Sequence, residues 1–399
     1  MKRLATLSVV FALAAAPCAF AATINVPGDQ PTIQSGINAA LKGDVVLVAP
    51  GTYVENINFM GKAITVKSSA GPAKTIIDGN AAAPVVVFLT NESVHSVLSG
   101  FTLQNGVGTF PFQYEGGGIF IYYASPTITK NIIRNNNAPY GGGVGVSFGS
   151  PVISYNTVTI NSATFGGGIS IGGASNAQVV HNTISKNTAA IGAGLQLFAA
   201  ANGTVANNKI VSNVASSEGG GIDIVNESDE IIVQNLIALN RAPSGSQIYS
   251  GVPQSARGFQ LISNTIVSFP TGGADAAVIA DGFNMNVVIE NNVINAAGDN
   301  AAIVCNPVYK YGPPIVQFND AFNGTLAYGG SCAGFAGTNG NISSDPALVN
   351  VAKGNYQLAV GSPAINAGSN SAPVVLKKDY AGHTRIVAVT IDMGAYEVQ

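Results

Sequence analysis

A repeat of about 26 residues constrains this 399-residue chain more than any other feature of its sequence. Glycine-rich runs followed by alternating aliphatic residues recur at spacings of 25, 25, 26 and 27, beginning at Gly116, Gly141, Gly166, Gly192 and Gly219. Asparagines recur in step with them, at Asn131, Asn156, Asn182, Asn208, Asn235, Asn264 and Asn292. Repeats of this length indicate one stack of similar units, so the chain length does not predict two or three separate globular domains.

The alternation within each unit predicts short strands rather than helices. Pairs such as Ile119/Ile121 and Val144/Val146 place one face inward, and the turns between strands carry Gly and Asn. Three short strands and three turns per unit make one coil of a parallel β-helix, in which each strand pairs with its equivalent one coil away at about 4.8 Å. We therefore predict an all-β, single-stranded parallel β-helix with coils of about 25–27 residues.

The aligned asparagines are predicted to be structural rather than functional. Asparagine tolerates the left-handed backbone of a sharp turn, and stacked amides can hydrogen-bond along the stack. The predicted ladder comprises Asn131, Asn156, Asn182, Asn208 and Asn235.

Composition excludes several classes of protein. Charged residues make up only 9%, and the mean hydropathy is +0.31, so a disordered chain is excluded. The net charge of −3 and the absence of a basic stripe argue against nucleic acid as a partner. We expect a monomer.

The N-terminus predicts export. Lys2 and Arg3 precede an apolar run, and Ala19-Phe20-Ala21 has the small-x-small pattern of a signal-peptidase site. We expect residues 1–21 to be removed, leaving a mature chain with no transmembrane segment. The expected location is extracellular or at the cell surface, and the periplasm stays open. In such compartments Cys305 and Cys332 are most simply a disulfide, with two buried thiols as the alternative.

Both ends of the solenoid are expected to carry caps. Residues 22–43 contain Pro31, Ile33, Ile37 and Leu41 at helical spacing before Gly43, which predicts a short amphipathic helix. Residues 44–339 form the predicted β-helix. From residue 340 the composition changes and charge increases, which predicts a C-terminal capping module over 340–399.

Several segments resemble a known superfamily. The VVLVAPGTYVENI run (Val45 to Ile57), LSGFTLQNG (Leu98 to Gly106) and the glycine-rich coils resemble secreted right-handed parallel β-helix proteins of the pectin-lyase-like superfamily. The tail, with GSPAINAG and DMGAYE, is similar to the closing module of bacterial choice-of-anchor proteins. The resemblance implies a right-handed helix, but this superfamily includes lyases, hydrolases, esterases and adhesins, so it does not imply one chemistry.

The motifs of the superfamily's enzymes are mostly missing. Gly51 to Glu55 matches the opening G-x-Y-x-E of pectin methylesterases, but their catalytic segments are absent. Polygalacturonase motifs are absent, and Arg134 and Arg241 occupy different offsets in their coils, unlike an aligned lyase base. The three histidines are isolated, which gives no support for a zinc site.

One strand surface carries the candidate functional residues. Alternation predicts that Phe120, Gly145, Ser170, Gln196 and Asp223 face solvent in one column. The residues before the glycine runs add Glu115, Tyr140, Phe165, Ile191 and Glu218. A nearby loop adds Phe110, Phe112 and Tyr114, and the strand end adds Tyr122 and Tyr123. Candidate substrate-binding residues are Phe120, Tyr122, Tyr140, Phe165 and Gln196. Glu218 and Asp223 are candidate catalytic residues or calcium ligands.

The leading hypothesis is a secreted protein that interacts with an extracellular polysaccharide or cell-surface glycan along its strand face. If the protein is an enzyme, it is a polysaccharide lyase or glycoside hydrolase, and calcium is a candidate cofactor. The competing hypothesis is a non-catalytic adhesin, matrix or spacer protein. In that case the aromatic residues cover the core and the acids form a solvated rim.

Overall fold

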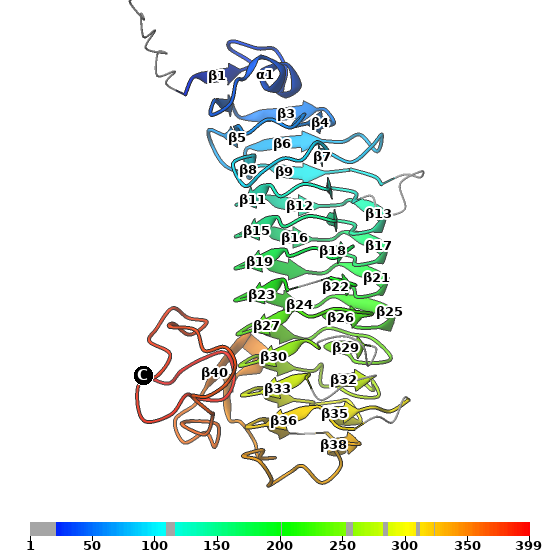
Figure 1. The fold of residues 1–399 in the computed structure, drawn as a ribbon, viewed down its shortest axis with the longest axis vertical. Helices are drawn as coiled ribbons and strands as arrows, with labels where there is room; N and C mark the ends of the chain where they lie inside the picture. Colours follow the sequence, from blue (N-terminus) through cyan, green and yellow to red (C-terminus); the bar gives the residue numbers. More distant parts are fainter. Residues whose placement is uncertain are drawn as a thin grey trace, which may run out of the picture.

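The computed structural model describes residues 21–108, 116–200, 202–252, 258–281, 286–308, 312–322 and 324–399. The predicted signal peptide up to residue 20, and the candidates Phe110, Phe112, Tyr114 and Glu115, lie outside these residues. The described coils stack into a straight rod, with the N-terminal coils at one end (Figure 1). The predicted parallel β-helix is confirmed, since strands within the three long sheets pair in parallel with the equivalent strand of the next coil.

Three long sheets, here A, B and C, form the sides of the rod in the described part of the chain. Sheet A contains β1 (Thr23–Val26), β2 (Val45–Val48), β5 (Thr65–Ser68), β8 (Val97–Ser99), β11 (Thr127–Thr129), β15 (Val152–Ser154), β19 (Gln178–Val180), β23 (Thr204–Ala206), β27 (Ile231–Val233), β30 (Gln260–Ile262), β33 (Val288–Glu290) and β36 (Ile315–Gln317). Sheet B contains β3 (Gly51–Val54), β6 (Thr75–Asp78), β9 (Thr102–Gln104), β12 (Ile132–Arg134), β16 (Thr157–Thr159), β20 (Thr183–Ser185), β24 (Lys209–Val211), β28 (Leu236–Ala238), β31 (Thr265–Val267), β34 (Val293–Asn295) and β37 (Asp320–Phe322). Sheet C contains β4 (Ile57–Asn58), β7 (Val86–Phe88), β10 (Ile119–Tyr122), β14 (Val144–Ser147), β18 (Ile169–Gly172), β22 (Leu195–Phe198), β26 (Ile222–Val225), β29 (Ile248–Gly251), β32 (Val278–Asp281), β35 (Ala301–Cys305) and β38 (Leu326–Gly330).

The middle coils contain a fourth strand, which the three-strand prediction missed. These strands form sheet D between sheets B and C, and they are β13 (Asn137–Tyr140), β17 (Ser162–Phe165), β21 (Thr188–Ile191) and β25 (Val214–Glu218). In the middle coils, from β10 to β28, one aliphatic side chain from each strand of A and B, and two from each strand of C, point inward. Ile128, Ile133, Val144 and Val146 of neighbouring coils show this pattern and are at most 2% exposed. Their burial supplies the main stabilising contribution to the rod.

Two asparagine ladders run along the rod, one just before the strands of sheet B and one just after them. The backbone N–H and Nδ2 of Asn131 donate to Oδ1 of Asn156 at 2.9 and 3.1 Å, and Nδ2 also donates to the carbonyl of Leu98 at 3.1 Å. The same pattern continues through Asn182, Asn208, Asn235, Asn264, Asn292, Asn319 and Asn341. The second ladder comprises Asn136, Asn161, Asn187, Asn213 and Asn240, and ends on Gln247.

The expectation that the ladder asparagines themselves adopt the left-handed conformation is wrong. The left-handed residue is the one immediately before, as in Lys130 (φ 58°), Tyr155 (φ 56°) and His181 (φ 56°). This residue turns the corner and points outward, whereas the asparagine after it points inward to meet the backbone groups that the turn leaves unpaired.

The N-terminal helix is shorter than predicted. Helix α1 (Ile33–Ala39) buries Ile33 and Ile37 in the core, but Leu41 lies beyond its end and is 74% exposed. Oε1 and Oε2 of Glu55 each accept a hydrogen bond of 2.9 Å, from the backbone N–H groups of Ile33 and Gln34. The Glu55 carboxylate therefore caps the first turn of α1, which gives the G-x-Y-x-E motif a structural role here.

The C-terminal residues both close the last coil and cover the side of the rod. Phe335 packs against the core and Asn341 ends the first ladder. The chain then folds back through β39 (Leu348–Asn350), the 3₁₀ helix η1 (Val351–Lys353) and β40 (Asn355–Leu358). Figure 1 shows this module in orange and red beside β27 to β36. Tyr356 packs on outer residues of sheet B, and Ala372 packs on outer residues of sheet A.

Cys305 and Cys332 form a disulfide beside the last coil, with their Cα atoms 5.4 Å apart. We expect mass spectrometry of non-reduced peptides to recover these two residues in one linked species. Alkylation of both thiols in the native, non-reduced protein would contradict this pairing. Within the described ranges, no helix is long and apolar enough to cross a membrane.

Candidate functional site

The column predicted to face solvent on sheet C is covered. Phe120 is 3% exposed, Ser170 5%, Gln196 2% and Asp223 0%. The prediction that these side chains form an open strand face is therefore wrong, although they do point away from the solenoid core and align between neighbouring coils.

The glycine-rich turns explain this covering. Gly219, with φ of 63°, lies so close over the strand that a Cβ added there would be 2.7 Å from the Cβ of Asp223. At Gly141, with φ of 61°, an added Cβ would be 2.6 Å from the Cα of Gly145. The turn before each strand thus folds back over its outer face, and only glycine permits both this conformation and this close approach.

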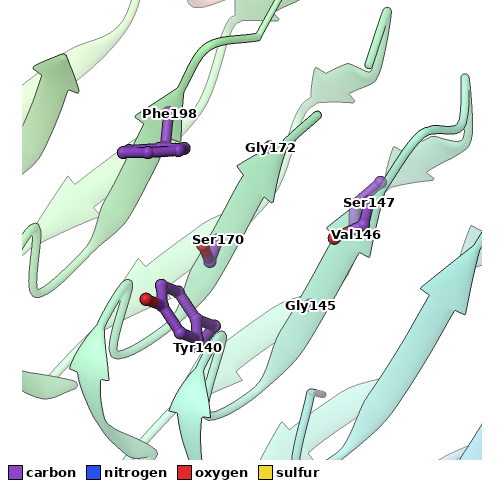
Figure 2. A pocket seen from close by; sticks show the side chains of 7 residues that line it. All are labelled: Tyr140, Gly145, Val146, Ser147, Ser170, Gly172 and Phe198. Atoms are coloured by element: carbon purple, nitrogen blue, oxygen red, sulfur yellow. The ribbon is translucent and has the colours of Figure 1, made fainter. Parts of the chain in front are cut away.

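A shallow groove remains open on the outer face of sheet C, beside the covering turns. Figure 2 shows the rings of Tyr140 and Phe198 on either side of Ser170. Gly145, Ser147 and Gly172 complete much of the floor, and the missing side chains of the two glycines and the small one of Ser147 create the depression. The free volume of about 10 Å³ has room for about one water molecule, so a ligand here lies on the surface rather than inside it.

The aromatic residues around the groove stack along the rod. The rings of Tyr140 and Phe165 are 4.9 Å apart at 16°, and those of Tyr123 and Phe148 are 4.8 Å apart at 9°. Stacking within a pair covers one face of each ring. Tyr123 and Phe148 remain 54% and 42% exposed, so part of each ring is accessible to a ligand. Tyr122 packs edge-on against both Tyr123 and Phe148.

Phe148 and Phe198 were not among the predicted residues. Both lie where a strand of sheet C ends, as Tyr122 and Tyr123 do one or more coils earlier. Aligning the strand ends, rather than only the strand centres, would have identified them. The predicted residues Tyr122, Tyr140 and Phe165 are half-buried at the groove or beside it.

The two candidate acids lie together beyond the end of the groove. Burial raises the pKa of Asp223 well above its ordinary value, the charge of Glu218 raises it further, and the hydrogen bond from Gln196 opposes both. Nε2 of Gln196 donates to Oδ2 of Asp223 at 3.4 Å, and Oγ of Ser170 donates to Oε1 of Gln196 at 3.3 Å. Oδ1 of Asp223 has no hydrogen-bond partner among the described residues.

Glu218 is the more accessible of the two acids, because it is half-buried whereas Asp223 is fully covered. Burial raises the pKa of Glu218 as well. Two neighbouring carboxyl groups with raised pKa values can hold and transfer a proton, but only Glu218 is within reach of a surface ligand. In the described part of the chain, no three His, Cys, Asp or Glu side chains are grouped to hold a metal ion.

Comparison with known proteins identifies the architecture. The family model described as "Right handed beta helix region" matches residues 76–238 and 118–342. A solved pectate lyase, Pel9A, is 14% identical, with a TM-score of 0.59 over 96% of this chain and 97% of its own. No curated protein matches the chain.

Two pectin methylesterase structures are less similar. One, solved in complex with a hexasaccharide, is 11% identical with a TM-score of 0.39 over 59% of this chain and 81% of its own. The other, PemA from Erwinia chrysanthemi, is 10% identical with a TM-score of 0.39 over 58% of this chain and 80% of its own.

Proposed function

Because this chain belongs to the right-handed β-helix family, whose stacked coils repeat the same positions along a rigid rod, we propose that it binds an extended polysaccharide along the outer face of sheet C. The observation that carries the proposal is the aromatic groove between Tyr140 and Phe198. Because the floor at Gly145 and Ser170 has room for only about one water molecule, a sugar ring contacts the aromatic rim at Tyr140 and Phe198 rather than the strands.

The shape of the groove favours a polymer over a small molecule. Small-molecule sites are generally enclosed cavities of several hundred Å³, whereas this depression holds only about 10 Å³. A polymer can instead gain affinity from many weak contacts repeated at the coil spacing of about 4.8 Å. The pectate lyase of the same fold supports a sugar polymer as the ligand.

Cleavage of the bound polymer is the second candidate function. It is favoured by the raised pKa values of Glu218 and Asp223, which lie further along the same face. Glu218 is the residue we propose as acid or base, with Asp223 influencing its protonation. We expect Glu218→Gln to abolish any release of reducing ends or unsaturated products by the wild-type protein. No turnover by the wild-type protein on any glycan would leave a binding, adhesive or spacer function.

We also propose that the protein is exported. The support for cleavage after Ala21 is the basic start, apolar run and small-x-small pattern of residues 1–21. In the structure the backbone nitrogen of Ala22 donates to Oδ1 of Asp44 at 2.8 Å. Cleavage would convert this nitrogen into a charged amino terminus beside a carboxylate, which strengthens the contact. N-terminal sequencing of secreted protein is expected to begin at Ala22, and a retained Met1 would contradict export by this route.

Affinity electrophoresis tests the binding proposal. We expect the wild-type protein to be retarded by at least one of a panel of acidic and neutral polysaccharides. Tyr140→Ala is expected to weaken retention about threefold to tenfold, equivalent to the ~0.5–1.5 kcal/mol of one aromatic stacking contact. The melting temperature should change by only a few degrees, because Tyr140 lies outside the core.

Tyr155→Ala provides the matched control. Tyr155 is also a stacked aromatic residue, 4.9 Å from the ring of His181 and 58% exposed, but it lies at the corner between sheets A and B. The proposal is contradicted if the wild-type protein is retained by no polysaccharide, or if Tyr155→Ala weakens retention as much as Tyr140→Ala.

A further inference from the structure

A polar hollow lies at the corner where sheet B leads into β13, and no part of the predicted site includes it. Its volume is about 470 Å³, far larger than that of the groove. Five of the nine described residues that line it carry a carboxylate or an amide, and they are Asp78, Asn80, Asn105, Asn135 and Asn137.

The carboxylate in the hollow is held in a fixed orientation. Oδ1 of Asp78 accepts the backbone N–H of Asn80 at 2.9 Å, and Oδ2 accepts Nε2 of Gln104 at 2.9 Å and Nδ2 of Asn105 at 2.8 Å. Nη2 of Arg134 donates to Oε1 of Gln104 at 3.0 Å and so fixes that amide in turn. A carboxylate has about four acceptor positions, so Asp78 can accept one more hydrogen bond.

Asp78 is charged at neutral pH. Burial alone would raise its pKa, but the hydrogen bonds from Gln104, Asn80 and Asn105 outweigh burial and lower it. Among the described residues that line the hollow, Asp78 is the one charged side chain, and the guanidinium of Arg134, which is not part of this lining, is hydrogen-bonded to Gln104.

The asparagines of the hollow do not recur at the same turn position in the later coils. Asn105 and Asn135 occupy the same left-handed turn position in successive coils, with φ of 57° and 54°. This position points outward and is not part of either buried ladder. Further along the rod, the same position is occupied by Ile160, Lys186, Ser212 and Leu239.

From this arrangement we infer that the hollow is a subsite for neutral, hydroxyl-rich sugar units of the bound glycan. An oriented carboxylate accepts hydrogen bonds from sugar hydroxyls, and neighbouring amides both donate and accept. The negative charge of Asp78 disfavours a carboxylated or sulfated sugar at the same place. The structure thus assigns the hollow a preference for neutral over acidic units.

The inference rests on the proposed function, because β13 connects the hollow to the groove. Asn137, at the start of β13, lines the hollow, and Tyr140, at its end, lines the groove. Three residues of extended strand span about 10 Å. One glycan of a few sugar units can therefore occupy both places.

Calorimetric titration with defined hexasaccharides tests the subsite. The neutral probes are cellohexaose, mannohexaose and xylohexaose, and the acidic probe is hexagalacturonate. We expect the wild-type protein to prefer at least one neutral probe. Asn135→Gly removes the amide while keeping the left-handed backbone, and it should weaken binding of that probe about tenfold. Asp78→Asn should weaken neutral binding similarly and improve binding of hexagalacturonate.

Ser212→Gly is the matched control, because it changes the same turn position outside the hollow, and it should bind like the wild-type protein. The subsite is overturned if the wild-type protein prefers hexagalacturonate to every neutral probe. It is also overturned if Asn135→Gly and Asp78→Asn bind like the wild-type protein while Tyr140→Ala binds more weakly, a result that leaves the groove proposal intact. Failure to bind any probe contradicts the subsite, and the polysaccharide panel then decides on the groove.

Discussion

Replacing Asn182 by alanine is expected to lower the free energy of unfolding by about 3 kcal/mol. Oδ1 of Asn182 accepts the backbone N–H and Nδ2 of Asn156 at 2.9 and 3.1 Å. Its Nδ2 donates to the carbonyl of Ile153 at 2.8 Å and to Oδ1 of Asn208 at 3.1 Å. Alanine removes all of these bonds and leaves several polar groups unpaired in a corner that is almost wholly buried.

Urea denaturation measures this loss, with Asn176→Ala as the matched control. Asn176 is exposed, and the hydrogen bond shown for it uses its backbone N–H rather than its amide. Asn176→Ala should change the stability by no more than about 0.5 kcal/mol. Equal denaturation midpoints for the two variants would refute a stabilising role for the ladder.

Replacing Glu230 by glutamine is expected to make the folded protein more stable than the wild-type protein at alkaline pH. Glu230 is 1% exposed, and neither carboxylate oxygen has a hydrogen-bond partner in another described residue. Burial raises its pKa from 4.5 to about 8, its own backbone N–H opposes this, and the charge of Asp229 adds to it.

The direction of the pH effect follows from proton binding. Between pH 4.5 and 8 the unfolded chain loses the proton of Glu230 while the folded chain keeps it, so folding stability falls as the pH rises through this window. A shift of this size corresponds to about 5 kcal/mol at most, at about 1.36 kcal/mol per pH unit. Asp223 and Asp320, whose pKa values are also raised by burial, add to the same trend.

Denaturation at pH 5 and pH 8 measures the difference. Glu230→Gln should lose a large part of the decline that the wild-type protein shows between these two pH values. Glu227→Gln, at an exposed site three residues away, should keep the full decline. An unchanged decline in Glu230→Gln would show that this carboxyl group is not the main source of the pH dependence.

The repeat made the fold predictable. The spacing of the glycine runs and asparagines implied stacked coils, because a unit of about 26 residues can bury its aliphatic face only against neighbouring units. The alternation around Ile222 and Ile224 also predicted correctly that Asp223 points away from the core. Alternation describes one strand, however, and could not show that the turn at Gly219 folds back over it.

The polar hollow was not predictable for a related reason. Asp78, Asn105 and Asn135 belong to three coils and to positions at or beyond the ends of strands, so no single motif contains them. Glu55 shows the opposite error, because its motif resembles part of an enzyme but its carboxylate caps α1 in the structure. In both cases the role of the side chain depends on the backbone segment that the fold places beside it, and that segment is distant in the sequence.

A tryptophan reporter tests whether a glycan lies in the groove on sheet C. The chain contains no tryptophan, so Tyr140→Trp and Tyr155→Trp each provide a single tryptophan, in the groove and at a different corner, whose emission is excited selectively at the red edge of its absorption. We predict that titration with the retained polysaccharide shifts the emission of Tyr140→Trp to shorter wavelength and saturates, while Tyr155→Trp does not respond. A saturable shift in Tyr155→Trp without one in Tyr140→Trp would place the glycan at the corner between sheets A and B and rule out binding in the groove.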